Sequence, residues 1–178
     1  MISEHHDCVF FLDVYDMLLE MQYAPFKQCI NEQPGILDSL RWRCDNRTLL
    51  MNAARRRHRE VFSKLLSYPQ DLSVVDHDGS TIFHHVAFSQ NEEWLEEIRN
   101  KRDINPIDLK RFINTKGGTG GWTLLHYATH LNNHNLIKWL FLNGADINIP
   151  RNDGKLANEL AVCDRETRRI FNANVSIM

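Results

Sequence analysis

The residues most able to do chemistry in this sequence are its nine histidines, three of which are regularly spaced. His126, His130 and His134 stand at i, i+4 and i+8, a spacing that would place three imidazoles on one face of a continuous helix, where they could bind a metal ion. Two observations argue against that site. Asn132-Asn133 falls where a turn between two helices belongs, and the sequence contains neither H-E-x-x-H nor a paired-cysteine motif. We therefore expect no metal and no cofactor.

A glycine-rich segment, K-G-G-T-G-G at residues 116–121, is similar to loops that cradle phosphate groups. In such loops a lysine and then a serine or threonine follow the last glycine, whereas Trp122 and Thr123 stand there in this chain. The segment also leads into a repeated motif instead of following an apolar strand. We interpret it as an elongated, flexible hairpin tip.

The cysteines, which with a histidine could form a catalytic pair, are far apart and include no C-x-x-C motif. They are Cys8, Cys29, Cys44 and Cys163. No motif sets a nucleophile beside a base, so we name no catalytic residue and predict that the chain is not an enzyme. Reduced thiols with a structural role are the simplest reading of this spacing.

The elements that must position these side chains come from an internal repeat. Four segments of the sequence align with one another, and they begin at Asn46, Gly79, Gly121 and Gly154. Their first residues are 33, 42 and 33 positions apart, so the middle spacing is one 33-residue period with nine residues inserted. A period of this length indicates a stack of small helical units.

The third segment, G-W-T-L-L-H-Y-A at residues 121–128, resembles the G-x-T-P-L-H-x-A motif of the ankyrin-repeat family, and residues 136–148 resemble the second half of that family's unit. Thr123 can satisfy backbone groups at a helix start, and Leu140 belongs to an apolar stripe on a second helix that Gly144 would end. The resemblance implies antiparallel helix pairs, and it implies that His126 hydrogen-bonds within the turn.

The copies depart from the family motif at three kinds of position. The proline is absent from every copy, and the first helical position is held instead by Leu49, Ile82, Leu124 and Ala157. The copy that begins at Asn46 has Met51 in place of histidine, and the last copy has Leu156 and Glu159 in place of threonine and histidine. The last copy is also truncated, as a terminal capping repeat would be.

The predicted fold is all-α, an ankyrin-repeat solenoid of about five stacked helix pairs joined by β-hairpin-like loops. We divide the single domain, residues 1–178, into an N-terminal cap repeat (8–42), three full repeats (43–75, 76–116 and 117–150) and a C-terminal cap repeat (151–178). The third unit carries an insertion at 100–112, where Pro106 and the apolar residues after it could form one or two helical turns. This insertion is either a loop that covers the stack or a contact site of its own.

In the ankyrin family a partner binds the concave face, which is formed by the hairpin tips and the first helix of each pair. Carrying the motif register onto this sequence gives a set of candidate partner-binding residues. They are Arg47, Arg55, Arg56, His85, Phe88, Trp122, Tyr127, His130 and Lys155. Arginine pairs with carboxylates and aromatic residues dominate binding hot spots, so this set favours a partner protein with acidic and apolar contact residues.

The overall charge argues against other partners. The formal net charge is −2, so no whole-chain field attracts nucleic acid or an anionic membrane, and no apolar run is long enough to span a bilayer. We expect a protein-interaction module, an adaptor, inhibitor or assembly subunit, in the cytoplasm or nucleus. One alternative is an inhibitor similar to the inhibitor of nuclear factor kappa-B, of the kind that viruses and other pathogens also make. Another is anion or nucleic-acid binding through the basic run Arg55–Arg59.

Overall fold

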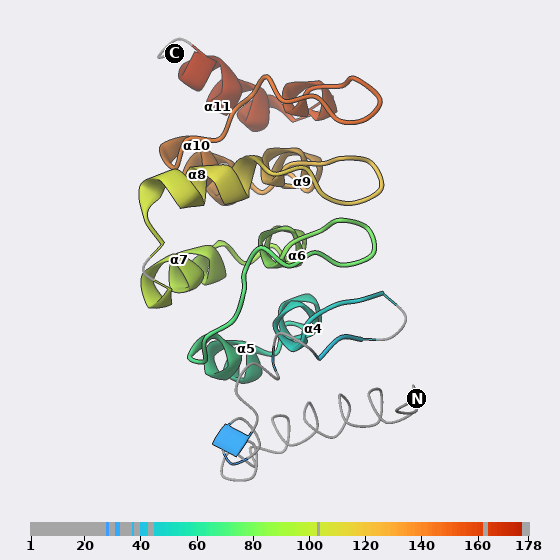
Figure 1. The fold of residues 1–178 in the computed structure, drawn as a ribbon. Helices are drawn as coiled ribbons and strands as arrows, with labels where there is room; N and C mark the ends of the chain where they lie inside the picture. The colour runs from blue at the N-terminus through green and yellow to red at the C-terminus, as the bar shows by residue number, and fades with distance from the viewer. Residues whose placement is uncertain are drawn as a thin grey trace.

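The computed structural model describes residues 45–102, 104–161 and 164–175, together with 28, 31, 32, 37 and 40–42. In this part of the chain, helix pairs stack on one another and loops project from one side of the stack (Figure 1). The described residues contain no β-strand, only an isolated antiparallel bridge between Gly117 and Trp122. The predicted all-α class is confirmed.

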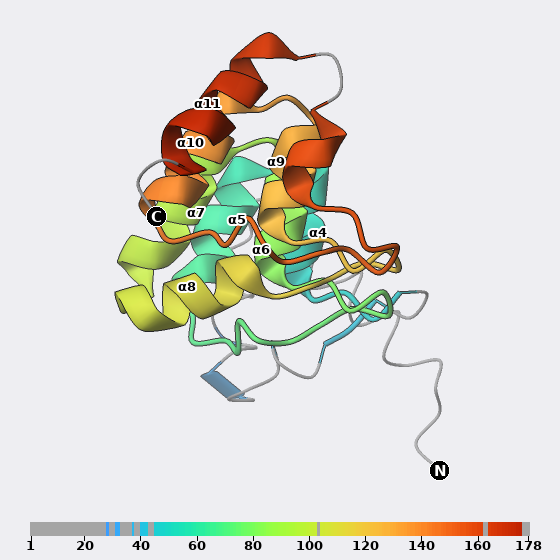
Figure 2. The ribbon, with the colours of Figure 1, turned by 90° about the horizontal axis from the view of Figure 1, so that it is seen from above.

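Each helix pair has a first helix next to the projecting loops and a second helix on the opposite side (Figure 1). The pairs are α4 (Leu49–Arg56) with α5 (Arg59–Leu66), α6 (Ile82–Ser89) with α7 (Glu92–Lys101), and α9 (Leu124–His130) with α10 (His134–Leu142). The last unit has a short 3-10 helix, η1 (Ala157–Leu160), followed by α11 (Arg165–Val175). Seen from above, the pairs lie over one another with their loops in register (Figure 2).

The turn inside each full pair uses a left-handed residue that is not glycine. Arg57, Gln90 and Asn132 have φ of 60°, 59° and 52°. This conformation costs roughly 1–2 kcal/mol for an ordinary residue, and it ends the first helix so that the second can pack back on it. The turn predicted at Asn132-Asn133 is confirmed, and Arg57 places the middle of the basic run in a turn.

The core is the apolar seam that runs between the two helices of each pair and continues into the next pair. Ala128 and Leu140 are fully buried, as the motif register predicts. The rings of Phe62 and Trp94 stack at 4.4 Å, which joins the second helices α5 and α7. Gly144, with φ of 83°, follows the last residue of α10 and the C-cap Asn143, again as predicted.

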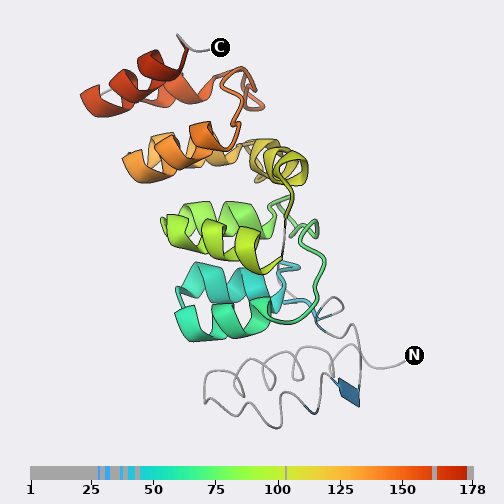
Figure 3. The ribbon, with the colours of Figure 1, turned by 90° about the vertical axis from the view of Figure 1, so that its left-hand side faces the viewer.

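The insertion forms a further helix, α8 (Pro106–Asn114). In Figure 3 it is seen nearly end-on, in yellow, so that it runs across the direction of the paired helices. Its start is set by Asn105, whose side chain accepts a hydrogen bond from the N–H of Asp108 at 2.9 Å, with proline next in the first turn. Phe112 stacks on Phe83 of α6 at 4.8 Å. The insertion is therefore a longer helix than the one or two turns predicted, and it packs onto the stack.

Some predictions lie on residues outside the described part of the chain. Most of the N-terminal cap repeat proposed for 8–42 lies outside the described residues, and so do all four cysteines. The division into repeats stays a prediction. In the last unit, the 3-10 helix η1 stands where the full repeats have an α-helix of seven or eight residues.

Candidate functional site

The first helix of each unit is anchored by the residue three positions after its capping residue, and His84 shows how. The N–H of Thr81 donates to His84 Nδ1 at 3.1 Å. Because Nδ1 accepts this bond, the ring proton lies on Nε2, which faces the carbonyl oxygens of Thr115 at 3.1 Å and Trp122 at 3.2 Å. Burial lowers the pKa of His84 to about 4, against the opposite effect of these carbonyls. The neutral ring thus ties α6 to the following hairpin.

His126 repeats this arrangement one unit later. The N–H of Thr123 donates to His126 Nδ1 at 3.2 Å, and Nε2 lies 3.3 Å from the carbonyl oxygen of Lys155. Burial lowers the pKa of this ring as well. The hydrogen bond within the turn that the resemblance implied is confirmed.

The two units without a histidine here keep an acceptor at the same position. The N–H of Thr48 donates to the sulfur of Met51 at 3.5 Å, and the N–H of Leu156 donates to Glu159 Oε2 at 2.5 Å. The departures from the motif therefore preserve the cap, while the bond from a histidine Nε2 to the next hairpin is lost. The acceptor at this position is a ring nitrogen in two units, a sulfur in one and a carboxylate oxygen in another.

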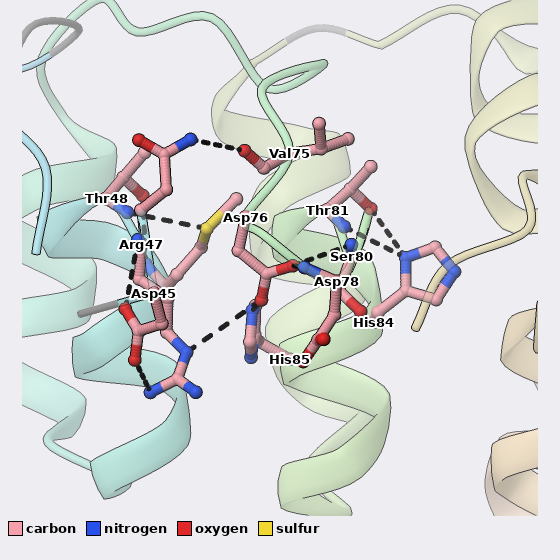
Figure 4. Close-up of polar contacts among 12 residues, drawn as sticks. Asp45, Arg47, Thr48, Val75, Asp76, Asp78, Ser80, Thr81, His84 and His85 are labelled. Carbon is pink, nitrogen blue, oxygen red and sulfur yellow. Dashed lines mark hydrogen bonds and ion pairs between the residues drawn. The ribbon is translucent and has the colours of Figure 1, made fainter. Parts of the chain in front are cut away.

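A buried aspartate organises the second hairpin, residues 76–80 (Figure 4). Asp76 Oδ1 accepts the N–H groups of Asp78 at 3.0 Å and Ser80 at 2.8 Å, and Oδ2 lies 2.9 Å from His85 Nε2. Burial raises the pKa of Asp76, but the hydrogen bonds from His85 and Ser80 outweigh it and hold the pKa below its usual value. The carboxylate is thus ionised and already supplied with donors.

Arg47, from the first hairpin, whose described residues 45–47 precede α4, approaches the same aspartate without hydrogen-bonding to it (Figure 4). Its Nη1 pairs with Asp45 Oδ2 at 2.7 Å, whereas its Nε lies 3.9 Å from Asp76 Oδ2. That distance exceeds the hydrogen-bond range, and the buried Nε has no acceptor among the described residues. The side chain keeps 18% of its surface exposed.

Neighbouring hairpins are joined by hydrogen bonds at two of the three junctions. The N–H of His77 donates to the carbonyl oxygen of Asp45 at 2.9 Å, and the N–H of Asn152 donates to that of Gly120 at 2.9 Å. Between the second hairpin and the third, residues 117–122, the described residues form no backbone hydrogen bond. A side chain bridges this junction instead, because the ring of His84 on α6 faces the carbonyl oxygen of Trp122 at 3.2 Å.

A pocket of ≈ 210 Å³ lies at this open junction. The buried side chains of Asp76, Ser80 and His85 line it, as does the glycine-rich third hairpin. Three aromatic residues complete its surface, and they are Phe88, Trp122 and Tyr127. The pocket combines an ionised, satisfied polar group with aromatic surface, which is the composition typical of a recognition site.

Trp122 is the centre of an aromatic group on the unit 117–150. Its ring lies 5.1 Å from that of Tyr127 and 5.3 Å from that of His130, in the second case perpendicular. The guanidinium of Arg151 lies 4.9 Å from the indole centroid. Burial raises the pKa of Tyr127, so its hydroxyl stays protonated near neutral pH.

Phe88 and Arg55 form the exposed border of the pocket. Phe88 is on the outer side of α6 and 47% exposed, which is unusual for a large aromatic residue on a helix so buried elsewhere. The Arg55 guanidinium lies 5.4 Å from the centroid of this ring. Among the described residues Arg55 has no carboxylate partner, so its charge is available to a ligand.

The structure brings together most of the predicted partner-binding residues. Six of the nine line the pocket, namely Arg47, Arg55, His85, Phe88, Trp122 and Tyr127. His130 contacts the ring of Trp122, while Arg56 and Lys155 are exposed and do not line the pocket. His85 is only 5% exposed, so it offers almost no surface to a partner and acts by holding Asp76.

Sequence reasoning missed two residues that shape this site. Asp76 stands three positions before Gly79, a spacing typical of an aspartate that caps its own turn, and this signal could have identified it. The reach of His84 to the next hairpin has no sequence signal of its own, because it depends on how closely the units stack.

The three regularly spaced histidines do not converge. His126 caps α9, and His134 Nε2 lies 2.6 Å from Asp164 Oδ2 at the start of α11. Within the described residues there is no group of three or more histidine, cysteine, aspartate or glutamate side chains that could hold a metal ion. The glycine-rich segment forms the third hairpin, closed by the Gly117–Trp122 bridge.

The basic run is divided between two helices and the turn that joins them. Arg55 and Arg56 end α4, Arg57 is the turn residue, and Arg59 begins α5. Arg59 pairs with Glu93 of the next unit at 3.3 Å. The run therefore does not form one continuous basic strip.

Comparison with known proteins places this arrangement in a broader class. Residues 50–151 match a family model described as ankyrin repeats, in three copies. No curated protein matches the chain. None of the described helices is long and apolar enough to cross a membrane.

Proposed function

The chain belongs to the ankyrin-repeat family, and we propose that it is a non-enzymatic adaptor, inhibitor or assembly subunit that binds a partner protein through its concave face. Ankyrin repeats are typically protein–protein interaction modules, because stacked units create an extended concave surface. The matching region, 50–151, contains the three units that contribute to the pocket.

The observation that carries this proposal is the exposed ring of Phe88 beside the pocket, with Arg55 above it. Aromatic and arginine side chains at the centre of an interface contribute most of the binding energy in many complexes. On α6 Phe88 is the one large hydrophobic side chain left exposed, while Ile82, Phe83 and Val86 are buried. This pattern suits a surface that a partner completes.

The test is a comparative pull-down from a cell extract, with mass spectrometry of the retained proteins. The wild-type chain is compared with a concave-face variant, Phe88→Ala, and with two second-helix variants, Glu93→Ala and Lys138→Ala. We expect a partner that the wild type and both second-helix variants retain and that Phe88→Ala loses. A partner lost equally from all three variants would contradict the proposal.

An inhibitor similar to the inhibitor of nuclear factor kappa-B is a narrower form of the same hypothesis, and a cytoplasmic or nuclear partner would agree with it. The same experiment tests it, because the retained protein would then be a transcription factor of that class. Anion or nucleic-acid binding is the less favoured alternative. The basic run is split between α4, a turn and α5, and Arg59 is paired with Glu93.

A further inference from the structure

We propose that the pocket between the second and third hairpins recognises a carboxylate side chain of the partner, with an apolar side chain beside it on Phe88. This inference rests on the proposed function and specifies the chemistry of the partner: an aspartate or glutamate next to an apolar residue. Its basis is the difference between what the acidic and the basic groups of this pocket already bind.

Two acidic groups in and next to the pocket are already satisfied. Asp76 receives hydrogen bonds from two backbone N–H groups and lies 2.9 Å from the His85 ring. Asp45 pairs with Arg47 at 2.7 Å and also accepts the N–H of that residue. Neither carboxylate needs a cation from a partner, so a basic ligand would gain little from them.

One of the two arginines that line the pocket is already paired and the other is not. Arg47 pairs with Asp45 at 2.7 Å, although its buried Nε has no acceptor among the described residues. Arg55 contacts only an aromatic ring among the interactions the described residues make. A guanidinium forms its strongest bonds with a carboxylate, which presents two oxygens to the planar fork. Arg55 is therefore the group of this pocket that a carboxylate of the partner would bind.

The size of the pocket limits what can enter. A volume of ≈ 210 Å³ is smaller than that of most small-molecule sites, which is roughly 300–1,000 Å³. One or two side chains fit such a space, whereas a whole helix does not. The apolar companion can rest on the exposed ring of Phe88, which Arg55 already holds in place from one side.

Asp78 provides a way to distinguish an acidic partner from a basic one. It is exposed, lines the same pocket as Arg55 and lies on the second hairpin. Its charge opposes an incoming carboxylate and would attract a basic group. Removing this charge must therefore change affinity in opposite directions for acidic and basic partners.

The experiment uses the full chain and a random 12-residue peptide library displayed on phage. We expect enriched peptides to share an aspartate or glutamate next to a large apolar residue. A synthetic peptide of the most enriched sequence should bind about fivefold more weakly to Arg55→Ala, as expected for an exposed ion pair, and more tightly to Asp78→Asn. Glu93→Gln, on α7, is the matched control and should leave affinity unchanged.

A double-mutant cycle isolates the contact. Replacing the acidic residue of the peptide by its amide should weaken binding to the wild type, and it should have little further effect on Arg55→Ala. Circular dichroism of each variant shows whether it has kept its helical content. Coupling between the two changes would identify the pair directly.

Three outcomes would overturn the inference. They are failure to enrich any peptide, enrichment of basic peptides that Asp78→Asn weakens, and an acidic residue that can be replaced by its amide without loss. If peptides are enriched without an essential acidic residue but still bind Phe88→Ala more weakly, the proposed concave interface survives and only the carboxylate assignment fails. If Glu93 and Lys138 variants weaken binding while Phe88→Ala does not, the proposed function fails as well.

Discussion

The concave face and the back face, which we define as the exposed side of α5, α7 and α10, use their polar side chains differently. On the back face, Arg59 of α5 pairs with Glu93 of α7 at 3.3 Å, and Lys101 of α7 donates a hydrogen bond to the carbonyl oxygen of Ser63 in α5 at 3.0 Å. The indole N–H of Trp139 donates to Glu96 at 2.5 Å, so α10 is bonded to α7. These side chains connect the second helices to one another.

The concave face connects its units through the backbone and leaves side chains available. Hairpin N–H and carbonyl groups join at two junctions, and at the open junction lie the pocket and the exposed Phe88 ring. Arg55, next to that ring, has no carboxylate partner among the described residues. The back-face contacts join the second helices, and the difference supports the proposal that a partner binds the concave face.

The largest predicted effect comes from a substitution in the core, on which both faces depend. Leu140→Asp places a charge in the fully buried seam between α9 and α10, which should lower the free energy of unfolding by about 3–5 kcal/mol. Lys138→Asp, on the exposed side of the same helix, should change it by only about 0.5 kcal/mol. Thermal unfolding followed by circular dichroism measures both. Equal melting temperatures for the two variants would show that the buried and exposed sides of α10 are wrongly assigned.

The sequence predicted that register because the motif carries it. Ala128 and Leu140 recur at helical spacing, Gly144 ends its helix, and the threonine–histidine spacing indicated the cap that His126 forms. These features are local, so a single unit is enough to predict them.

What the sequence did not predict depends on contacts between residues far apart in the chain, within one unit or between two. Within one unit, His85 is buried where it faces Asp76, nine residues earlier, and α8 packs on Phe83 through Phe112. Between two units lies the open hairpin junction with its pocket. There the glycine-rich third hairpin is bonded to the ring of His84 on α6. No pattern within one repeat encodes such a contact between units.

A change of pH should weaken the hairpin side of the stack first. The pKa of His84 is about 4 in the folded chain and 6.5 in an unfolded one, so the unfolded state binds the proton more readily between these values. The free energy of unfolding should therefore be steady above pH 6.5 and fall by about 1.4 kcal/mol per pH unit as the pH drops toward 4, with His126 adding to the slope.

Urea unfolding at pH 7, 6 and 5 checks this dependence. His84→Gln removes one titrating ring and should show a shallower slope, although it should also be less stable at pH 7 because the Thr115 and Trp122 carbonyls lose a buried donor. An unchanged slope in His84→Gln would show that another group controls stability in this range.

A third prediction separates the two faces by affinity. Phe88→Ala should lower partner affinity by about 2 kcal/mol, roughly thirtyfold, because the substitution removes an aromatic anchor that the partner would bury. Its effect on folding should be small, since the ring is largely exposed in the free chain. Calorimetric titration against the identified partner measures the change, with Glu93→Ala as the back-face control. A loss of twofold or less for Phe88→Ala would remove it from the interface.

The smallest predicted effect concerns the rate of binding. Arg55→Ala should reduce the association rate about fivefold at low salt and make it less sensitive to ionic strength, since a charge at the border of an interface acts before contact. Arg169→Ala, an exposed arginine on α11, is the matched control and should leave the rate unchanged. Surface plasmon resonance at two salt concentrations gives both values. Equal effects of the two arginines would mean that only overall charge matters.

The central claim is that this chain binds its partner with the concave face, and hydrogen–deuterium exchange of the complex tests it most directly. We expect slower exchange on binding in the second and third hairpins and in α6 and α9, with exchange in α5, α7 and α10 unchanged. Protection confined to α7 and α10 would contradict it. Protection confined to α8, where Ile107 is 82% exposed, would move the site to the insertion.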